Sequence, residues 1–283
     1  HLSIRRQRQM CIRDRKNTNL HFTPDPSTKS RANVGGAMGN NSCGSHSVIY
    51  GKTVDQVREM EVILSDSSKA YFEELSGKRL EDKISLDNLE GKIYRDVMSM
   101  SSKYYDEIND KYSKVNRRVG GYNLDLVHPN SNKLNLVNIM VGSEGTLGII
   151  AEVHLRLSPI PENIMSAVCH FHDLESAVLT AQEIIQYGIP VARIEMLNKD
   201  QMEISINYSN LKNMEKKPTL FFEFHGSESS NKESVELAQD ISKNNLGTDF
   251  KWAQNTEDRN KLWQARHDVY YSVKSQSNNF RVY

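Results

Sequence analysis

A glycine-rich segment at residues 33–53, NVGGAMGNNSCGSHSVIYGKT, constrains this chain more than any other stretch. Its ending, Gly-Lys-Thr, is similar to the end of a nucleotide-phosphate loop. Such a loop needs the pattern G-x-x-x-x-G-K-[ST] and a helix directly after it. Position 46 holds a histidine where the first glycine should be, and residues 56–64 alternate like a strand. The segment is therefore not a phosphate loop of that kind, and its glycine spacing also fails the dinucleotide pattern G-x-G-x-x-G.

Closely spaced glycines can hold an anion in another way. Glycine lets backbone N–H groups form a concave nest, and asparagine tolerates the left-handed conformations of such a loop. These residues alone leave two interpretations open, a diphosphate cradle and a tightly packed turn. A second segment, VGSEGTLGII at 141–150, again pairs glycines with hydroxyl groups before a strand. We expect the two loops to close on one extended cofactor.

Charge and cysteine content exclude several classes of function. The chain has 36 basic and 36 acidic residues, so no overall field favours nucleic acid or an anionic membrane, and we expect no nucleic-acid partner. No apolar run approaches the roughly 18 residues that a bilayer-spanning helix needs. The cysteines are odd in number and far apart, at Cys11, Cys43 and Cys169. This pattern indicates a reducing compartment and predicts no metal site within the chain.

Both ends of the chain are unusual. Residues 1–16, HLSIRRQRQMCIRDRK, lack an initiator methionine and are rich in arginine. They are typical of a basic leader or, as we favour, of foreign sequence from cloning, and they are excluded from the fold prediction. The chain ends at Tyr283 directly after a helical pattern. We expect a fragment truncated at both ends.

The remaining pattern predicts an α+β chain with a boundary at residues 158–163, where two prolines end a strand. Before it, residues 76–118 form a charged helical insertion. Its apolar stripe packs internally or faces a partner and comprises Ile93, Val97, Met100, Tyr104, Ile108, Tyr112 and Val115. After the boundary, strands at 164–171, 191–197 and 219–226 alternate with helices, and Asp173 and Gly188 are predicted to begin and end the first of these helices.

These segments resemble a known family. VGGAMGNNSCGSHSVIYGKTVDQVREMEVIL, GGYNL and VGSEGTLGIIAEVHLRLSP together are similar to the vanillyl-alcohol-oxidase or PCMH-type FAD-binding fold. The narrower resemblance is to FAD-linked oxidases, which include D-lactate, glycolate and D-2-hydroxyglutarate dehydrogenases, and the C-terminal segments are most similar to the D-lactate subgroup. The resemblance implies the C-terminal part of an FAD-binding domain over 17–160, followed by an incomplete ferredoxin-like α/β substrate (cap) domain over 161–283.

The resemblance also implies the site residues and the cofactor, which is FAD instead of NAD. The residues implied along the flavin and its pyrophosphate are Gly35, Gly36, Asn40, Asn41, Ser42, Cys43 and Gly44. Those implied around the adenosine end are Glu144, Gly145, Thr146, Leu147, Gly148, Ile149 and Ile150. In KLWQARHDV the family places an arginine that holds the substrate carboxylate, here Arg266. By spacing alone, a helix-surface arginine in a salt bridge is the better interpretation of Arg266, and Arg193 is either a polar contact near the flavin or the partner of Glu195 or Glu223.

The implied reaction is oxidation of a D-2-hydroxy acid, D-lactate as first candidate, by hydride transfer to flavin N5. Electrons would then pass to a cytochrome, a quinone or an electron-transfer flavoprotein, and a homodimer is compatible with the resemblance. The family's upstream GGGTS loop and its GDGNxH and GEHG segments are absent. We therefore expect no catalytic base and no metal ligand before residue 283, and no activity from this chain alone.

Alternatives of other classes stay open. The insertion at 76–118 also resembles larger FAD-linked oxidases with a C-terminal iron–sulfur domain, and a non-catalytic flavoprotein fragment or subunit is a further hypothesis. The resemblance predicts a cytoplasmic protein, or one peripheral at a membrane, and a mitochondrial one if the source is eukaryotic.

Overall fold

The computed structural model describes residues 18–26, 32–128 and 132–276. They divide into two compact units, the first ending at Ile160 and the second beginning at Pro161, and each unit is described by itself. The expected leader at residues 1–16 lies outside the described residues.

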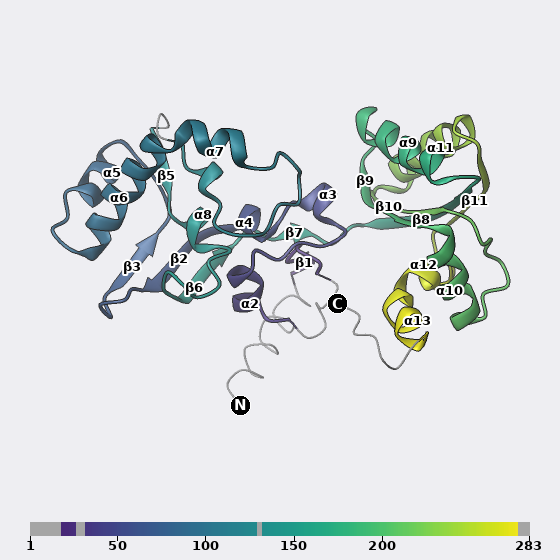
Figure 1. Cartoon of the computed structure of the whole chain (residues 1–283), viewed down its shortest axis with the longest axis horizontal. Helices are drawn as coiled ribbons and strands as arrows, with labels where there is room; N and C mark the ends of the chain where they lie inside the picture. Colours follow the sequence, from purple (N-terminus) through teal and green to yellow (C-terminus); the bar gives the residue numbers. More distant parts are fainter. Residues whose placement is uncertain (1–17, 27–31, 129–131, 277–283) are drawn as a thin grey trace. The chain divides into compact units, whose positions relative to one another are not determined.

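The core of the first unit is a three-stranded antiparallel sheet in the order β3–β2–β6 (Figure 1). Its strands are β2 (Val57–Ile63), β3 (Lys69–Phe72) and β6 (Ile149–Leu155), so the strand predicted at 56–64 is confirmed. Two small pairs complete the unit's strands: β4 (Glu74–Ser76) with β5 (Lys133–Asn135), and β1 (Leu20–His21) with β7 (Ser158–Pro159).

Short helices occupy much of the glycine-rich segment, which the sequence had indicated as a loop. They are α2 (Val34–Gly39), α3 (Ser47–Tyr50) and α4 (Thr53–Gln56). The side chain of Asn33 accepts the Gly36 N–H at 2.5 Å, which satisfies one of the donors at the start of α2. Ala37 and Met38 are buried, and Met38 packs into the core of the unit. A cap and this apolar contact make one helical turn stable despite its glycines.

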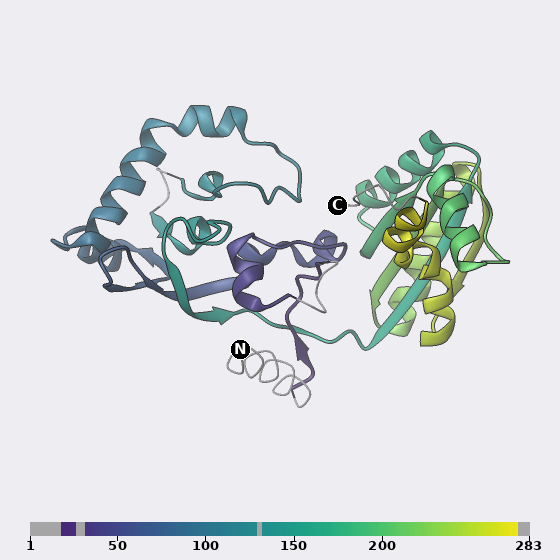
Figure 2. The ribbon, with the colours of Figure 1, turned by 60° about the horizontal axis from the view of Figure 1, so that its bottom comes forward.

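The insertion at 76–118 is helical, as predicted, but it forms three helices instead of one continuous stripe. These are α5 (Gly77–Ile84), α6 (Leu89–Lys103) and α7 (Tyr105–Lys111), and they lie along the outer edge of the first unit (Figures 1 and 2). Val115 lies beyond α7 and is 64% exposed. The other six residues of the predicted stripe line an apolar cavity of about 800 Å³ together with residues such as Leu136 and Met140.

The sequence between the insertion and β6 returns to the core of the first unit. It contains the 3₁₀ turn η1 (Leu124–Leu126) and the short helix α8 (Val137–Met140). Val137 and Met140 belong to the same buried cluster as Met60 and Val62 of β2. This packing holds the start of the second glycine segment against the sheet.

The second unit is a four-stranded antiparallel sheet in the order β11–β8–β10–β9. Along the chain its elements are β8 (Asn163–Phe171), α9 (Leu174–Gln186), β9 (Val191–Leu197), α10 (Lys199–Ser209), β10 (Thr219–Gly226), α11 (Glu228–Asn244) and β11 (Gly247–Ala253). With α10 as an addition, this βαββαβ order and strand arrangement are those of a ferredoxin-like fold. The helices α12 (Thr256–His267) and α13 (Val269–Ser275) follow.

Both faces of this second sheet are covered. On one face, Met165, Phe222 and Phe224 form a core with residues of α9 and α11. On the other, Phe221 packs with Met202 of α10 and Trp263 of α12. Burial on both faces explains the continuous apolar run of β10. The contact between Phe221 and Trp263 places α12, which carries Arg266, directly on the sheet.

The predicted ends of α9 are confirmed. Asp173 accepts the Ser176 N–H at 2.8 Å, and Gly188, just past the helix, has a left-handed φ of 69°. None of the described helices is both long and apolar enough to cross a bilayer.

Candidate cofactor and substrate sites

The two glycine segments of the first unit are joined through their backbones. The Gly142 N–H donates to the Met38 carbonyl at 2.8 Å, and the Glu144 N–H donates to the Gly39 carbonyl at 2.9 Å. These two hydrogen bonds thus hold side by side two segments that are about a hundred residues apart in sequence.

The second segment turns sharply at its centre. Glu144 and Gly145 are consecutive residues with positive φ, 50° and 79°. A non-glycine residue in this region carries a local strain of about 1 kcal/mol or more and is frequent at ligand sites. The N–H groups of Gly145 and Leu147 have no partner among the described residues, and both residues are exposed. This turn therefore offers main-chain donors to a ligand.

Gly44 has a packing role that the sequence did not indicate. A Cβ at this position would stand 1.7 Å from the carbonyl oxygen of Asp25, so only glycine fits. By contrast, a Cβ on Gly39 or Gly145 would meet nothing within 4 Å. Gly44 thus allows the loop to pack closely against the Asp25 backbone, whereas Gly39 and Gly145 have open space beside them.

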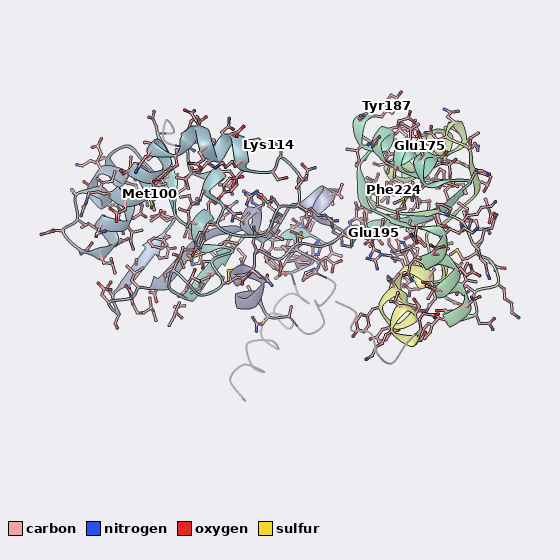
Figure 3. All side chains as sticks on the ribbon, in the orientation of Figure 1. Met100, Lys114, Glu175, Tyr187, Glu195 and Phe224 are labelled. Atoms are coloured by element: carbon pink, nitrogen blue, oxygen red, sulfur yellow. The ribbon has the colours of Figure 1, made fainter. Side chains whose placement is uncertain are left out.

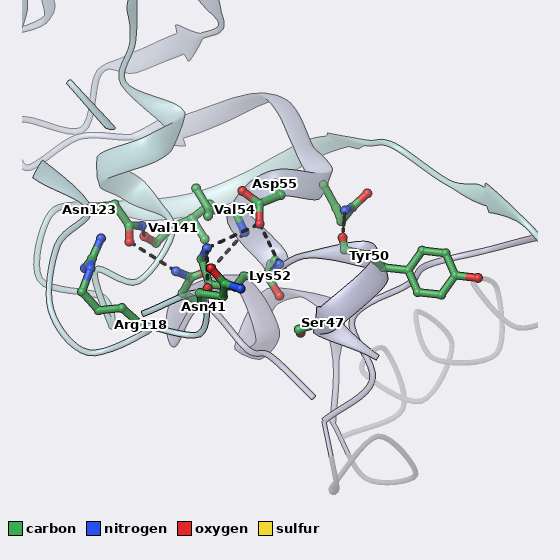
Figure 4. A network of polar contacts seen from close by, with 12 residues as sticks. Asn41, Ser47, Tyr50, Lys52, Val54, Asp55, Arg118, Asn123 and Val141 are labelled. Carbon is green, nitrogen blue, oxygen red and sulfur yellow. Dashed lines mark hydrogen bonds and ion pairs between the residues drawn. The ribbon is translucent and has the colours of Figure 1, made fainter. Parts of the chain in front are cut away.

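Asn41 is fully buried and holds the two segments together (Figure 4). Its Oδ1 accepts the Val54 N–H at 3.0 Å, and its Nδ2 donates to Asn123 Oδ1 at 3.3 Å. Asn123 in turn donates through Nδ2 to the Val141 carbonyl at 2.9 Å. The side chain of Asn41 is occupied by this network, while Asn40 and Ser42 bond each other at the surface at 2.6 Å.

Lys52, the lysine of the Gly-Lys-Thr ending, is committed elsewhere. Its Nζ lies 3.6 Å from Asp55 and donates to the Asn116 carbonyl at 3.3 Å. Only a single helical turn, α4, follows before β2 begins at Val57. Both facts agree with the rejection of a phosphate loop.

The arrangement fits a dinucleotide-sized group such as FAD. The test is the donor set: Gly145 and Leu147 have unsatisfied N–H groups on an open surface, and the N–H of Cys43 in the facing segment also lacks a partner among the described residues. Main-chain donors of this kind hold phosphate and heterocycle acceptors without a side chain. Leu147 and Ile149 are 39% and 67% exposed, which leaves apolar surface for a ring to cover.

In the second unit, Arg266 projects from α12 toward strand β9. Its Nε–H donates to Oε2 of Glu195, whose position on β9 is labelled in Figure 3. The Arg266 side chain is 36% exposed and Glu195 17%. No bond of the two terminal amino groups of Arg266 is found within the part of the chain that the structure describes. These groups are free to take a carboxylate.

A second and more buried ion pair lies beside the first. Arg193 donates to Glu223 Oε2 at 2.6 Å from the neighbouring strand, and the other oxygen of Glu223 lies 2.8 Å from Nε2 of His225. The guanidinium of Arg193 stacks on Trp263 at 3.6 Å from the ring centre. Arg193 is therefore the partner of Glu223, one of the alternatives the sequence left open, and its stacking on Trp263 had no sequence signal.

His267 also stacks on Trp263. Its ring centre is 6.1 Å from that of Trp263. Burial, then the charges of Arg193 and Arg266, lower the pKa of His267 below its usual value. The neutral imidazole adds no positive charge to the cluster at neutral pH.

Two further histidines, His170 and His172, are separated by one residue in sequence but have different surroundings. His170 is buried and its Nδ1 lies 2.7 Å from Thr219 Oγ1, whereas His172 follows β8 and its side chain is 86% exposed. Cys43 and Cys169 are free, and burial raises the pKa of the Cys169 thiol to about 12.

Two family models match successive parts of this chain. An FAD binding domain matches residues 14–68, and the C-terminal domain of FAD linked oxidases matches residues 160–280. Among solved structures, alkyldihydroxyacetonephosphate synthase superposes with a TM-score of 0.60 over 95% of this chain and 43% of its own, at 15% identity, which shows the shared fold.

Curated relatives agree with the models. A probable mitochondrial D-lactate dehydrogenase of Danio rerio is 33% identical over 91% of this chain and 42% of its own length. A mitochondrial D-lactate dehydrogenase [cytochrome] of Arabidopsis thaliana is 38% identical over 49% of this chain and 24% of its own. A D-2-hydroxyglutarate dehydrogenase of Pseudomonas putida is 31% identical over 50% and 14%.

The chain thus spans less than half the length of these relatives. Within that span, the matched models follow one another in the order of the two units, and the joined glycine segments supply a surface suited to the dinucleotide. The chain therefore belongs to the FAD-linked oxidase family, and its cofactor is FAD.

Proposed function

We propose that this chain is part of an FAD-dependent dehydrogenase that oxidises a D-2-hydroxy acid, with D-lactate as the first candidate, and that Arg266 holds the substrate carboxylate. The observation that carries the proposal is the accessible guanidinium of Arg266, anchored at Nε and open at its terminal amino groups. The names of the curated relatives support the class of substrate.

The chemistry divides between cofactor and protein. FAD, when bound, accepts the hydride. Arg266 fixes the substrate, because a planar guanidinium binds a carboxylate through two parallel N–H bonds and so orients the adjacent carbon. The joined segments would hold the cofactor mainly through main-chain donors of Cys43, Gly145 and Leu147, with Asn41 as a positioning residue instead of a direct contact.

The further assignments are proposals of the same kind. Gly35, Gly36, Asn40, Ser42, Gly44 and the residues from Glu144 to Ile150 would line the cofactor, and a cytochrome, a quinone or an electron-transfer flavoprotein would take the electrons. No residue of this chain is assigned as catalytic base.

The test is anaerobic reduction of the flavin in the full-length protein. D-Lactate should bleach the flavin absorption band, D-2-hydroxyglutarate should be compared with it, and L-lactate should leave the band unchanged. Arg266→Ala should raise the KM for D-lactate about 30-fold or more, the cost of about 2 kcal/mol for a lost hydrogen bond to a charged group.

The matched control is Arg259→Ala. Arg259 lies two turns earlier on α12, bonds Thr256 at 3.3 Å, and should tolerate the change. Full-length protein without flavin, or an unchanged KM in Arg266→Ala, would refute the proposal.

A further inference from the structure

The ion pair of Arg266 and Glu195 is more exposed than the neighbouring ion pair of Arg193 and Glu223. Arg193 and Glu223 are nearly buried, with side chains 14% and 9% exposed, whereas Arg266 keeps 36% of its side chain exposed. The buried pair is suited to support the fold. The accessible pair leaves the terminal amino groups of its guanidinium without a bond among the described residues.

The contact from Glu195 occupies one definite part of the guanidinium. A guanidinium has five N–H donors in a planar fork, one on Nε and two on each terminal nitrogen. Glu195 accepts from Nε, so the donors left over are those of the terminal nitrogens. These include the parallel end-on pair that matches the two oxygens of a carboxylate.

The base of the Arg266 side chain is positioned by the other pair. Trp263 and Arg266 are three residues apart on α12 and so share a face of the helix. Trp263 is fixed by the stacked guanidinium of Arg193, and Arg193 stands two residues before Glu195 on β9. Strand β9 thus contacts α12 at two points. Arg193 stacks on Trp263, and Glu195 accepts the bond from Nε of Arg266.

We propose that Glu195 is a positioning residue for carboxylate binding: it holds Arg266 by Nε so that the terminal amino groups present a preformed fork. This inference rests on the proposed function of Arg266. Immobilising a long side chain only when the ligand arrives lowers affinity by a factor of about five to ten, and Glu195 removes that cost. Its negative charge acts in the opposite direction, since a carboxylate repels the anionic ligand.

The two effects separate in matched variants. Glu195→Gln keeps an oxygen acceptor for Nε and removes the charge, so it should bind the ligand as well as the parent or more tightly. Glu195→Ala removes both and should bind about five- to tenfold more weakly. Glu195→Asp keeps the charge but withdraws the acceptor by one methylene, and it should resemble Glu195→Ala.

The readout needs no flavin. This chain has two tryptophans, Trp252 and Trp263, so in the full-length protein Trp252→Phe leaves Trp263, one turn from Arg266, as the only tryptophan that this chain contributes. Pyruvate, the 2-oxo acid that D-lactate yields, is titrated into this background and its variants while Trp263 fluorescence is followed. The KM for D-lactate of the full-length protein is measured in parallel, and far-UV circular dichroism checks that each variant folds.

The outcomes are distinct. Weaker binding by Glu195→Ala and Glu195→Asp together with retained binding by Glu195→Gln supports the proposal. Binding by Glu195→Ala at least as tight as the parent overturns it, because Glu195 would then only neutralise charge. Equal loss in Glu195→Gln and Glu195→Ala also overturns it. If Arg266→Lys leaves pyruvate binding unchanged, the proposed function itself fails; if that variant loses binding and Glu195→Ala does not, only this inference fails.

Discussion

The joined glycine segments of the first unit and the charged cluster of the second unit present different kinds of hydrogen-bond donor. The charged cluster comprises Arg193, Glu195, Glu223 and Arg266. The first presents main-chain N–H groups, while the fully buried side chain of Asn41 is occupied inside the protein. The second presents a side chain, Arg266, held by another side chain, Glu195. The first surface should therefore be sensitive to changes that move the backbone, and the second to changes of charge and side-chain reach.

The largest effect is expected for Gly44→Ala. The new methyl group would stand 1.7 Å from the Asp25 carbonyl oxygen, so the backbone must move, at a cost of about 3 kcal/mol or more. Gly39→Ala is the control, because its methyl group meets nothing within 4 Å. Both tryptophans lie in the second unit, so circular dichroism should show early unfolding of Gly44→Ala while the fluorescence transition stays in place. Equal stability of the two alanine variants would contradict the packing role.

Next comes Arg193→Met in the second unit. It removes the guanidinium from the nearly buried Glu223 carboxylate, which should cost about 2–3 kcal/mol in the free energy of unfolding. Lys216→Met breaks an exposed pair with Glu203 in the same unit and should cost less than about 0.5 kcal/mol. Denaturant unfolding followed by tryptophan fluorescence compares them, and similar losses would show that burial does not distinguish these pairs.

Asn41→Ala should have a smaller effect on the first unit. It leaves the Val54 N–H and the Asn123 side chain without their partner, which costs about 2 kcal/mol. Asn40→Ala removes only an exposed bond to Ser42 and should cost far less. Far-UV circular dichroism during thermal unfolding measures both, and full-length protein reports whether flavin content falls with Asn41→Ala alone. An Asn40→Ala variant as unstable as Asn41→Ala would indicate that burial of the amide is not decisive.

The smallest effect concerns pH. Burial lowers the pKa of His170 below the ordinary 6.5, so the unfolded chain takes up a proton more readily than the folded one. Stability should therefore fall as pH drops below about 6.5, by at most about 1.4 kcal/mol per pH unit from this group. His170→Gln should flatten that dependence, and His172→Gln, at an exposed site, should not. Identical pH profiles for all three proteins would rule out His170 as the source.

Much of the fold followed from local patterns. Alternation predicted the strand at 56–64, and Asp173 and Gly188 marked the ends of α9, because caps and strand periods depend on neighbouring residues only. The division of the insertion into α5, α6 and α7 did not follow: the apolar stripe begins only at Ile93, after the break at Ser85, and it continues across the break at Tyr104. The cavity that the stripe residues line also needs residues far away in the chain, such as Leu136 and Met140.

By itself, the sequence predicted that the two glycine segments act as a pair, and its resemblance to FAD-linked oxidases added the prediction that Arg266 binds a carboxylate, because both predictions rest on residue type and order. Only the tertiary structure decided that Asn41 faces inward, that Gly44 rests on Asp25, and that Glu195 holds Arg266 while Arg193 holds Glu223. These facts are long-range contacts. A spacing along the chain does not specify them, because the same spacing allows several partners, and packing selects one.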